Sequence, residues 1–205
     1  FLPNPFFESF VTTQRAAAAY KDVLSDVGAN QPFFDQHDIR IVDETLRGTY
    51  TYKGSKSGLG GLIDNEADQG GWPEFKTENR PSDWDTDHDG LPNWWEETHG
   101  LNPNSTVGDF SDTNLDKDKD GFTQLDDYLD WMSKPHYFIN QGESFEISIS
   151  DYFKGFEKKP VYSVSNIQNG NTILKGKKLQ FTPLQKGLAS FVITVVDAEG
   201  DAMSR

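Results

Sequence analysis

The chain has 205 residues, 35% of them hydrophobic and 13% aromatic, which is enough for one to three small domains and excludes a disordered tail. Its net charge of −14 repels DNA, RNA and anionic membranes, so nucleic acid is not an expected partner. With no cysteine, no apolar run of membrane-spanning length and no signal peptide at Phe1, we expect a mature product or a fragment whose leader lay upstream.

Residues 1–80 predict a segment of helices and irregular structure that packs on an upstream domain. Its opening, residues 1–7, is aromatic and contains two prolines, so we expect it to be extended and docked on another surface. Residues 49–80 are rich in glycine and polar side chains, which predicts irregular structure without a core of its own.

Two helices are predicted within this segment. The first extends from a cap at Thr13 to about Val27, and the second from a cap at Asp35 to Gly48. The apolar stripes that these helices are expected to bury are Ala16, Tyr20, Val23, Leu24 and Val27 in the first, and Ile39, Val42 and Leu46 in the second.

Residues 81–135 contain two twelve-residue runs of one pattern, 85–96 and 116–127, which we call the first and second acidic loops. Each has aspartate at positions 1, 3 and 5, glycine at position 6 and an acid at position 12. Each leads into a short helix, expected to end at Gly100 in one case and before Pro135 in the other. No amphipathic helix precedes either loop, so the pattern predicts two loop–helix units rather than complete helix–loop–helix hands.

The acidic loops predict two calcium sites. Ca²⁺ takes about six to eight oxygen ligands, and alternating side chains plus one backbone carbonyl supply them around a tight glycine turn. We expect the second site to be weaker, because Asp127 is one methylene shorter than Glu96. The expected ligands are Asp85, Asp87, Asp89, the backbone carbonyl of Leu91, Asn93 and Glu96 in the first loop, and Asp116, Asp118, Asp120, the backbone carbonyl of Phe122, Gln124 and Asp127 in the second.

From residue 136 the hydrophobic period changes to two. Alternating apolar residues near 145–149 and 191–195, with glycines between short runs, predict a small antiparallel β-sandwich of immunoglobulin-like type over residues 136–205. We expect this sandwich to lack its last strand, because the chain ends soon after a turn at residues 197–201. The whole chain is therefore predicted to be α+β, with three segments: 1–80, 81–135 and 136–205.

The residues predict no catalytic centre. The four histidines have no zinc-ligand spacing, and no serine lies in a nucleophile-elbow pattern. Trp94, Trp95 and Trp131 have helical spacing beside the acidic loops, which favours a place in a core over stacking on sugar rings. Trp72 is likewise expected to lie in a core rather than to stack on a sugar ring.

Several motifs in order give residues 12–132 a family resemblance. These motifs are Ala17-Ala-Ala-Tyr20, Val27-Gly28-Ala29, Asp38-Ile-Arg40-Ile-Val42, Gly61-Leu-Ile-Asp64, Gly70-Gly71-Trp72-Pro73, the first acidic loop with Trp95-Glu96, Gly100-Leu101-Asn102-Pro103 and the second acidic loop through Tyr128. Together they resemble the C-terminal section of secreted bacterial pectate lyases, polysaccharide lyase family 1. Residues 137–205 resemble cadherin-like or immunoglobulin-like modules that follow secreted proteins.

The resemblance implies a place in a larger protein. In that family a catalytic parallel β-helix precedes this section, and no stack of short strands in residues 1–80 supplies one. The resemblance therefore implies a calcium-binding, non-catalytic part of a secreted or cell-surface bacterial protein, whose parent is expected to be a pectate lyase-like polysaccharide lyase. Its expected partners are an upstream β-helix domain or a co-bound chain, and an acidic plant polysaccharide. Two alternatives are a dockerin-like module that binds a partner protein and a carbohydrate-binding module.

Overall fold

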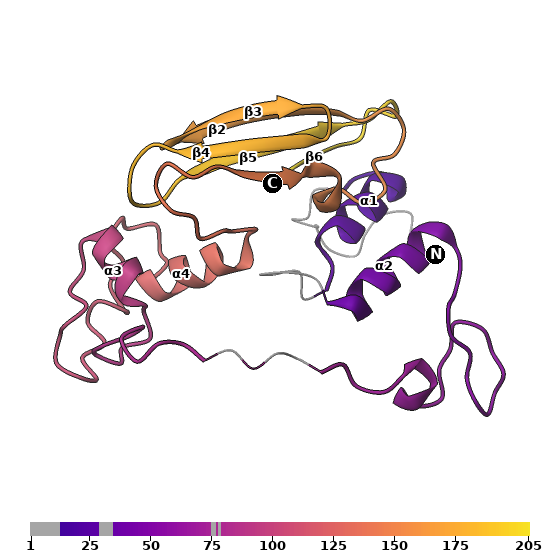
Figure 1. Cartoon of the computed structure of the whole chain (residues 1–205), viewed down its shortest axis with the longest axis horizontal. Coiled ribbons are helices and arrows are strands. Elements are labelled where there is room, and N and C mark those ends of the chain that lie inside the picture. The colour runs from indigo at the N-terminus through magenta and orange to yellow at the C-terminus, as the bar shows by residue number, and fades with distance from the viewer. Residues whose placement is uncertain (1–12, 29–34, 75–76, 78) are drawn as a thin grey trace, which may run out of the picture. The chain divides into compact units, whose positions relative to one another are not determined.

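The computed structural model describes residues 13–28, 35–74, 77 and 79–205. Within these residues the fold has four α-helices and two antiparallel three-stranded sheets, so the predicted mixed α+β class is confirmed (Figure 1). The predicted docking of residues 1–7 lies outside the described residues. None of the described helices has the length and apolar character needed to cross a membrane.

The chain divides into two compact units. One, the sheet unit, comprises the described part of Phe1–Gly28 together with Gln141–Gln185 and Ala189–Arg205. The other, the loop unit, comprises the described part of Ala29–Asn140 and Lys186–Leu188. A helix predicted to belong with the N-terminal segment is therefore part of the unit that contains the strands.

The sheet unit has two antiparallel sheets, of order β1-β4-β3 and β2-β5-β6 (Figure 1). The turn at residues 197–201 leads into β6, a three-residue strand that sequence analysis did not predict and that pairs with β5. The strands are β1 (Phe145–Ser148), β2 (Val161–Gln168), β3 (Gly170–Lys175), β4 (Lys178–Pro183), β5 (Ser190–Val196) and β6 (Ala202–Ser204).

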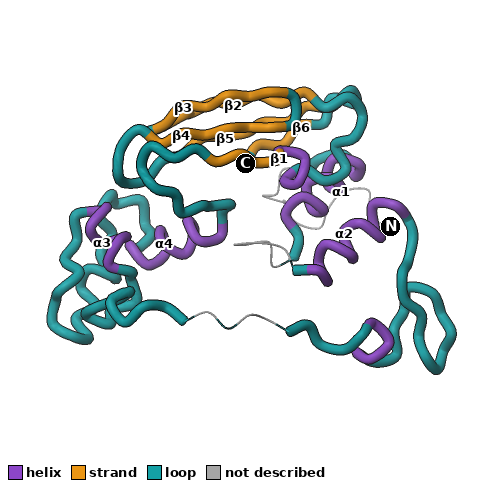
Figure 2. Tube along the Cα trace, in the orientation of Figure 1, coloured by secondary structure: helices purple, strands orange, loops and turns teal. Residues whose placement is uncertain are grey.

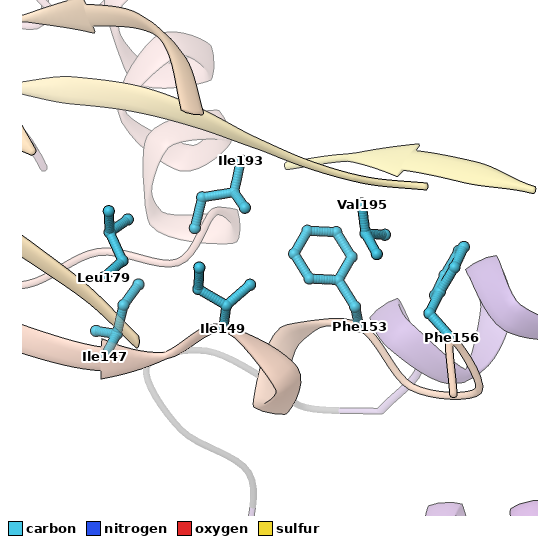
Figure 3. Packing of buried hydrophobic residues seen from close by; sticks show 7 residues of the cluster. All are labelled: Ile147, Ile149, Phe153, Phe156, Leu179, Ile193 and Val195. Carbon is cyan, nitrogen blue, oxygen red and sulfur yellow. The ribbon is translucent and has the colours of Figure 1, made fainter. Parts of the chain in front are cut away.

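Both sheets contribute to one apolar core. Leu179 of β4 and Val195 of β5 are fully buried, as the alternation of apolar and polar residues along each strand requires. Ile149 is also fully buried, but it lies in the short 3₁₀ helix η2 (Ile149–Tyr152), so the predicted strand is shorter than expected. Figure 3 shows Ile193 and Val195 pointing toward Ile149 and Phe153.

Helix α1 (Ala16–Asp26) corrects two predictions. Its N-cap is Arg15 rather than Thr13, and Arg15 makes no side-chain capping bond. Its predicted apolar stripe is largely exposed, and Leu24 alone among the stripe residues is buried. The face that packs against the sheets instead carries Lys21 and Ser25, because the surface that it meets is acidic and polar.

Lys21 is the centre of a buried ion cluster. The residue is only 6% exposed, and its ammonium group donates hydrogen bonds to Asp197, Glu199 and Asp201 of the β5–β6 turn. The Nζ atom lies 2.8 Å from both Glu199 Oε2 and Asp201 Oδ2. Arg15 forms a further ion pair with Asp201. Helix α1 is thus held on the β5–β6 turn by charge, with three carboxylates around one ammonium.

This cluster makes the stability of the sheet unit sensitive to acid. Hydrogen bonds from Lys21 and Arg15 lower the pKa of Asp201. Burial alone raises the pKa of Asp197, but hydrogen bonds from Lys21 and from the backbone N–H groups of Glu199 and Asp201 outweigh it and lower that pKa. A carboxyl whose pKa is lower in the folded than in the unfolded chain stabilises the fold above its unfolded pKa of about 4. That stabilisation is lost as the pH falls through the folded-state pKa.

We therefore expect the free energy of unfolding of the sheet unit to fall as the pH is lowered from about 5 to about 2. Denaturant titrations followed by far-ultraviolet circular dichroism measure this fall. The Lys21→Met chain, which lacks the ammonium group, should show a shallower dependence on pH. An equally steep dependence would show that other carboxyls cause the effect.

Helix α2 (Gln36–Arg47) has the predicted caps. The Asp35 side chain accepts a hydrogen bond from the Asp38 N–H, and Gly48 ends the helix in the left-handed conformation, with φ +62°. Of the predicted stripe, Val42 is buried, Leu46 is half-buried and Ile39 is exposed, so the buried face is narrower than expected. Residues 49–74 form loops and one 3₁₀ turn, η1 (Glu66–Gln69), as the irregular composition predicted (Figure 2).

Candidate metal centre

The two acidic loops have the same backbone conformation. The residue at position 4 is left-handed in both, with φ +58° at His88 and +65° at Lys119. The glycine at position 6 has φ +99° in both loops, a backbone conformation that residues other than glycine rarely adopt. Sequence similarity between the loops therefore corresponds to the same turn geometry.

Matching hydrogen bonds fix the acidic side chains at position 1. The Gly90 N–H donates to Asp85 Oδ2, and the Gly121 N–H donates to Asp116 Oδ2, each over 3.1 Å. In both cases the other carboxylate oxygen, Oδ1, is buried and has no partner. Each loop thus holds one oxygen of its first aspartate with the backbone and leaves the other bare.

The aspartates at position 5 are also held in matching ways. The Leu91 N–H donates to Asp89 Oδ1 and the Phe122 N–H to Asp120 Oδ1, each over 2.9 Å. Within each loop, carboxylate oxygens of the aspartates at positions 1, 3 and 5 lie within 4.8 Å of one another. Such clusters can hold a metal ion, which bears out the coarse form of the prediction.

Each loop leads into its helix at position 9. Helix α3 (Asn93–His99) ends at Gly100, and helix α4 (Gln124–Ser133) ends at Lys134, as predicted. The two helices share an apolar cluster around Leu91, Trp95 and Tyr128. Packing of both helices into one cluster holds the two loops in a single body.

The tryptophans beside the loops belong to this cluster. Trp95 is buried, and Trp94 and Trp131 pack against it, with their ring centroids 5.8 and 6.1 Å from that of Trp95. This confirms the core prediction for these three residues. Trp72 is 83% exposed, so the same prediction was wrong for Trp72.

The first loop contains buried acidic groups that lack partners. Glu96 is 0% exposed and Asp87 is 1% exposed. Both carboxylate oxygens of Glu96 and the Oδ1 atom of Asp87 have no hydrogen-bond partner. A buried carboxylate without a partner is costly, so these atoms call for a cation or a proton.

Burial, together with the negative charges of Asp87, Asp89, Asp112 and Asp85, raises the pKa of Glu96 to about 8. The carboxyl of Glu96 therefore faces the acidic side chains at the other ligand positions. A doubly charged ion among these groups reverses the repulsion, because it attracts every carboxylate that surrounds it.

Residues outside the twelve-residue pattern orient the ligands of the first loop. The Ser105 N–H donates to Asp87 Oδ2 over 3.0 Å, and the Gly108 N–H donates to the Asp87 carbonyl, also over 3.0 Å. The buried Thr113 hydroxyl lies 2.7 Å from Asp89 Oδ2. Sequence analysis missed these residues, because nothing in the alternating acidic pattern indicates which later backbone and side-chain groups return to it.

The residues at position 9 differ between the loops. The Asn93 side chain is already hydrogen-bonded: Oδ1 accepts from the Thr86 N–H over 2.9 Å, and Nδ2 donates to the carbonyl of Asp83, just before the loop. In contrast, Gln124 is buried and its Oε1 atom has no partner. Gln124 thus presents a bare ligand oxygen, whereas direct ligation by Asn93 requires loss of a hydrogen bond.

The second loop is more open than the first. Asp118 and Asp120 are exposed, whereas Asp87 and Asp89 are buried. At position 12, burial raises the pKa of Asp127, and the charges of Asp118 and Asp120 add to the effect. The two loops therefore share one geometry but differ in how much water reaches their acidic groups.

A third acidic group within the described residues, Asp197, Glu199 and Asp201, has ligand oxygens equally close together. Its centre is taken by the Lys21 ammonium group, and Arg15 and Lys158 also form ion pairs with it, so three cations balance its three carboxylates.

Comparison with family models, with curated proteins and with solved structures finds no match for this chain.

Proposed function

We propose that residues 85–127 form a calcium-binding structural module with two sites, in which the ions fix the acidic loops against helices α3 and α4. The observation that carries the proposal is the set of buried oxygens without partners. Among the described residues, all of these oxygens except Asp22 Oδ1 of α1 lie at expected ligand positions in the two loops, namely Asp85 Oδ1, Asp87 Oδ1, both oxygens of Glu96, Asp116 Oδ1 and Gln124 Oε1. Calcium suits them because it prefers several carboxylate and amide oxygens in a flexible shell.

A structural role suits this arrangement better than a catalytic one. Four candidate ligands of the first loop, Asp87, Asp89, Leu91 and Glu96, are buried, and the exit helices pack together through an apolar cluster. An ion in each loop would bond to residues in the first turn of the helix that follows that loop. Its binding free energy would therefore add to the stability of the packed helix pair.

We further propose that the chain is a non-catalytic part of a secreted bacterial protein related to pectate lyases, with the sheet unit as an immunoglobulin-like accessory module. The apolar core that the two sheets share supports the proposal of an immunoglobulin-like module. An upstream domain, such as a β-helix, would explain the apolar side chains that residues 35–74 leave exposed. These exposed side chains are Ile39, Ile41, Leu59, Leu62, Ile63 and Trp72.

Calorimetric titration of Ca²⁺ into the Glu96→Gln chain tests the first site. We expect the affinity of one of two sites to fall by at least about tenfold, because a ligand is lost and outer-shell losses alone cost about 10–100-fold. The Glu97→Gln chain is the matched control, since Glu97 is the exposed neighbour on the same helix. The site that persists in the Glu96→Gln chain should be the weaker site of the unaltered chain.

Either of two outcomes would refute the proposal. One is a full-length chain that takes up no calcium in the titration. The other is an equal change in affinity for the Glu96→Gln and Glu97→Gln chains, which would mean that general acidity, rather than the cage, attracts the ion.

A further inference from the structure

A short segment, residues 113–115, forms hydrogen bonds both to the first acidic loop and to the start of helix α4. Thr113 is 3% exposed, and its hydroxyl lies 2.7 Å from Asp89 Oδ2 and 2.9 Å from the Asp89 carbonyl oxygen. A hydroxyl has one proton, so it donates to one of these acceptors at a time. The Thr113 carbonyl accepts a hydrogen bond from the Leu125 N–H over 3.2 Å.

The segment has a second bond to the other loop. The Leu115 carbonyl accepts from the Gln124 N–H over 2.9 Å. Gln124 is the residue whose bare amide oxygen belongs to the candidate site of the second loop. Residues 113–115 therefore bond to a candidate ligand of the first loop at one side and to the backbone of a candidate ligand of the second loop at the other.

We propose that Thr113 is a positioning residue that couples the two metal sites, an inference that rests on the proposed function. An ion in the second loop holds Gln124 and Asp127, and so fixes the first turn of α4. That turn fixes the backbone of Thr113 through the Leu125 N–H, and the Thr113 hydroxyl then holds the Asp89 carboxylate in its ligating orientation. By linkage, an ion in the first loop strengthens binding in the second by the same factor.

The contacts of Asp87 give the proposal an internal contrast. Asp87 is held by the N–H groups of Ser105 and Gly108, and both belong to the stretch that precedes Thr113. The two backbone hydrogen bonds between residues 113–115 and the start of α4, in contrast, join the neighbourhood of Asp89 to the second loop. Coupling should therefore depend on the hydroxyl at position 113.

The test is a calcium titration of four full-length chains: unaltered, Thr113→Val, Thr113→Ser and the control Thr98→Val. Valine keeps the shape of threonine without its hydroxyl, and serine keeps the hydroxyl. Thr98 lies on the exposed side of α3, and its hydroxyl donates to the Trp94 carbonyl instead of to a loop. We expect the first-site affinity to fall about tenfold in Thr113→Val and to stay within about threefold in Thr113→Ser and Thr98→Val.

Coupling is measured by adding Asp120→Ala, which disables the second loop, to the unaltered and Thr113→Val chains. In the unaltered background this change should lower first-site affinity by at least about fivefold. In the Thr113→Val background it should lower it less than about twofold. Melting in chelator, followed by tryptophan fluorescence, reports whether each variant folds.

The outcomes separate the two proposals. No calcium uptake by the unaltered chain refutes the proposed function and the coupling together. Two bound ions with equal first-site affinity in the Thr113→Val and unaltered chains refute the coupling alone. Equal losses in the valine and serine variants also refute it, because packing, rather than the hydroxyl, would then be responsible.

Discussion

Replacing Lys21 with methionine is expected to destabilise the sheet unit by about 3–5 kcal/mol, the cost of removing one partner from a buried ion pair. The change leaves Asp197 and Asp201 buried without the ammonium group that balances them. Because Lys21 is almost fully buried, solvent screening does little to reduce this cost. Differential scanning calorimetry and far-ultraviolet circular dichroism measure the loss.

The matched control is Lys134→Met, which removes an exposed partner of Asp130 in helix α4. That change should cost no more than about 0.5 kcal/mol. If the Lys21→Met and Lys134→Met chains melted alike, the ion cluster would not be what holds α1 on the strands.

Removing calcium should have an effect of similar size on the loop unit. At free Ca²⁺ 100-fold above its dissociation constant, each site stabilises the folded state by about 2.7 kcal/mol. A chelator removes this contribution and leaves several buried carboxylates close together, so we expect an earlier and broader unfolding transition. All five tryptophans lie between residues 72 and 131, so tryptophan fluorescence reports the loop unit selectively.

The sheet unit supplies the control for this experiment. Its acidic triad is paired with Lys21, Arg15 and Lys158, so the unfolding transition of the strands, followed by far-ultraviolet circular dichroism, should not respond to calcium. A chelator that leaves the tryptophan-detected transition unmoved would contradict a structural role for the ions. A calcium response confined to the sheet unit would place the site elsewhere.

Features set by neighbouring residues could be predicted from the sequence. The cap of α2 at Asp35 and the exits of both acidic loops depend on residues within a few positions of each other. The twelve-residue pattern likewise indicated where the bare oxygens of Asp116 and Gln124 would lie. In these cases local geometry determines the outcome, so a short stretch of sequence contains the necessary information.

Features set by distant residues could not be predicted in this way. The apolar period of α1 indicated a buried stripe through Val23, but the helix buries Lys21 because its partners lie 176 to 180 residues further along the chain. Thr113 was missed for a related reason, since its acceptor lies 24 residues earlier. Hydrophobic periodicity favours burial of apolar groups, and a pocket of carboxylates assembled by the fold overrides it.

The discontinuous make-up of the sheet unit has a consequence for biosynthesis. Lys21 leaves the ribosome long before Asp197, Glu199 and Asp201, and at translation speeds of about 5–20 residues per second the interval is on the order of 10–35 s. During that time the nascent α1 has no acidic turn to receive it, whereas both acidic loops are complete about 70 residues before Asp197 is synthesised. The acidic loops and their exit helices can therefore fold before the turn at residues 197–201 is synthesised and recruits α1.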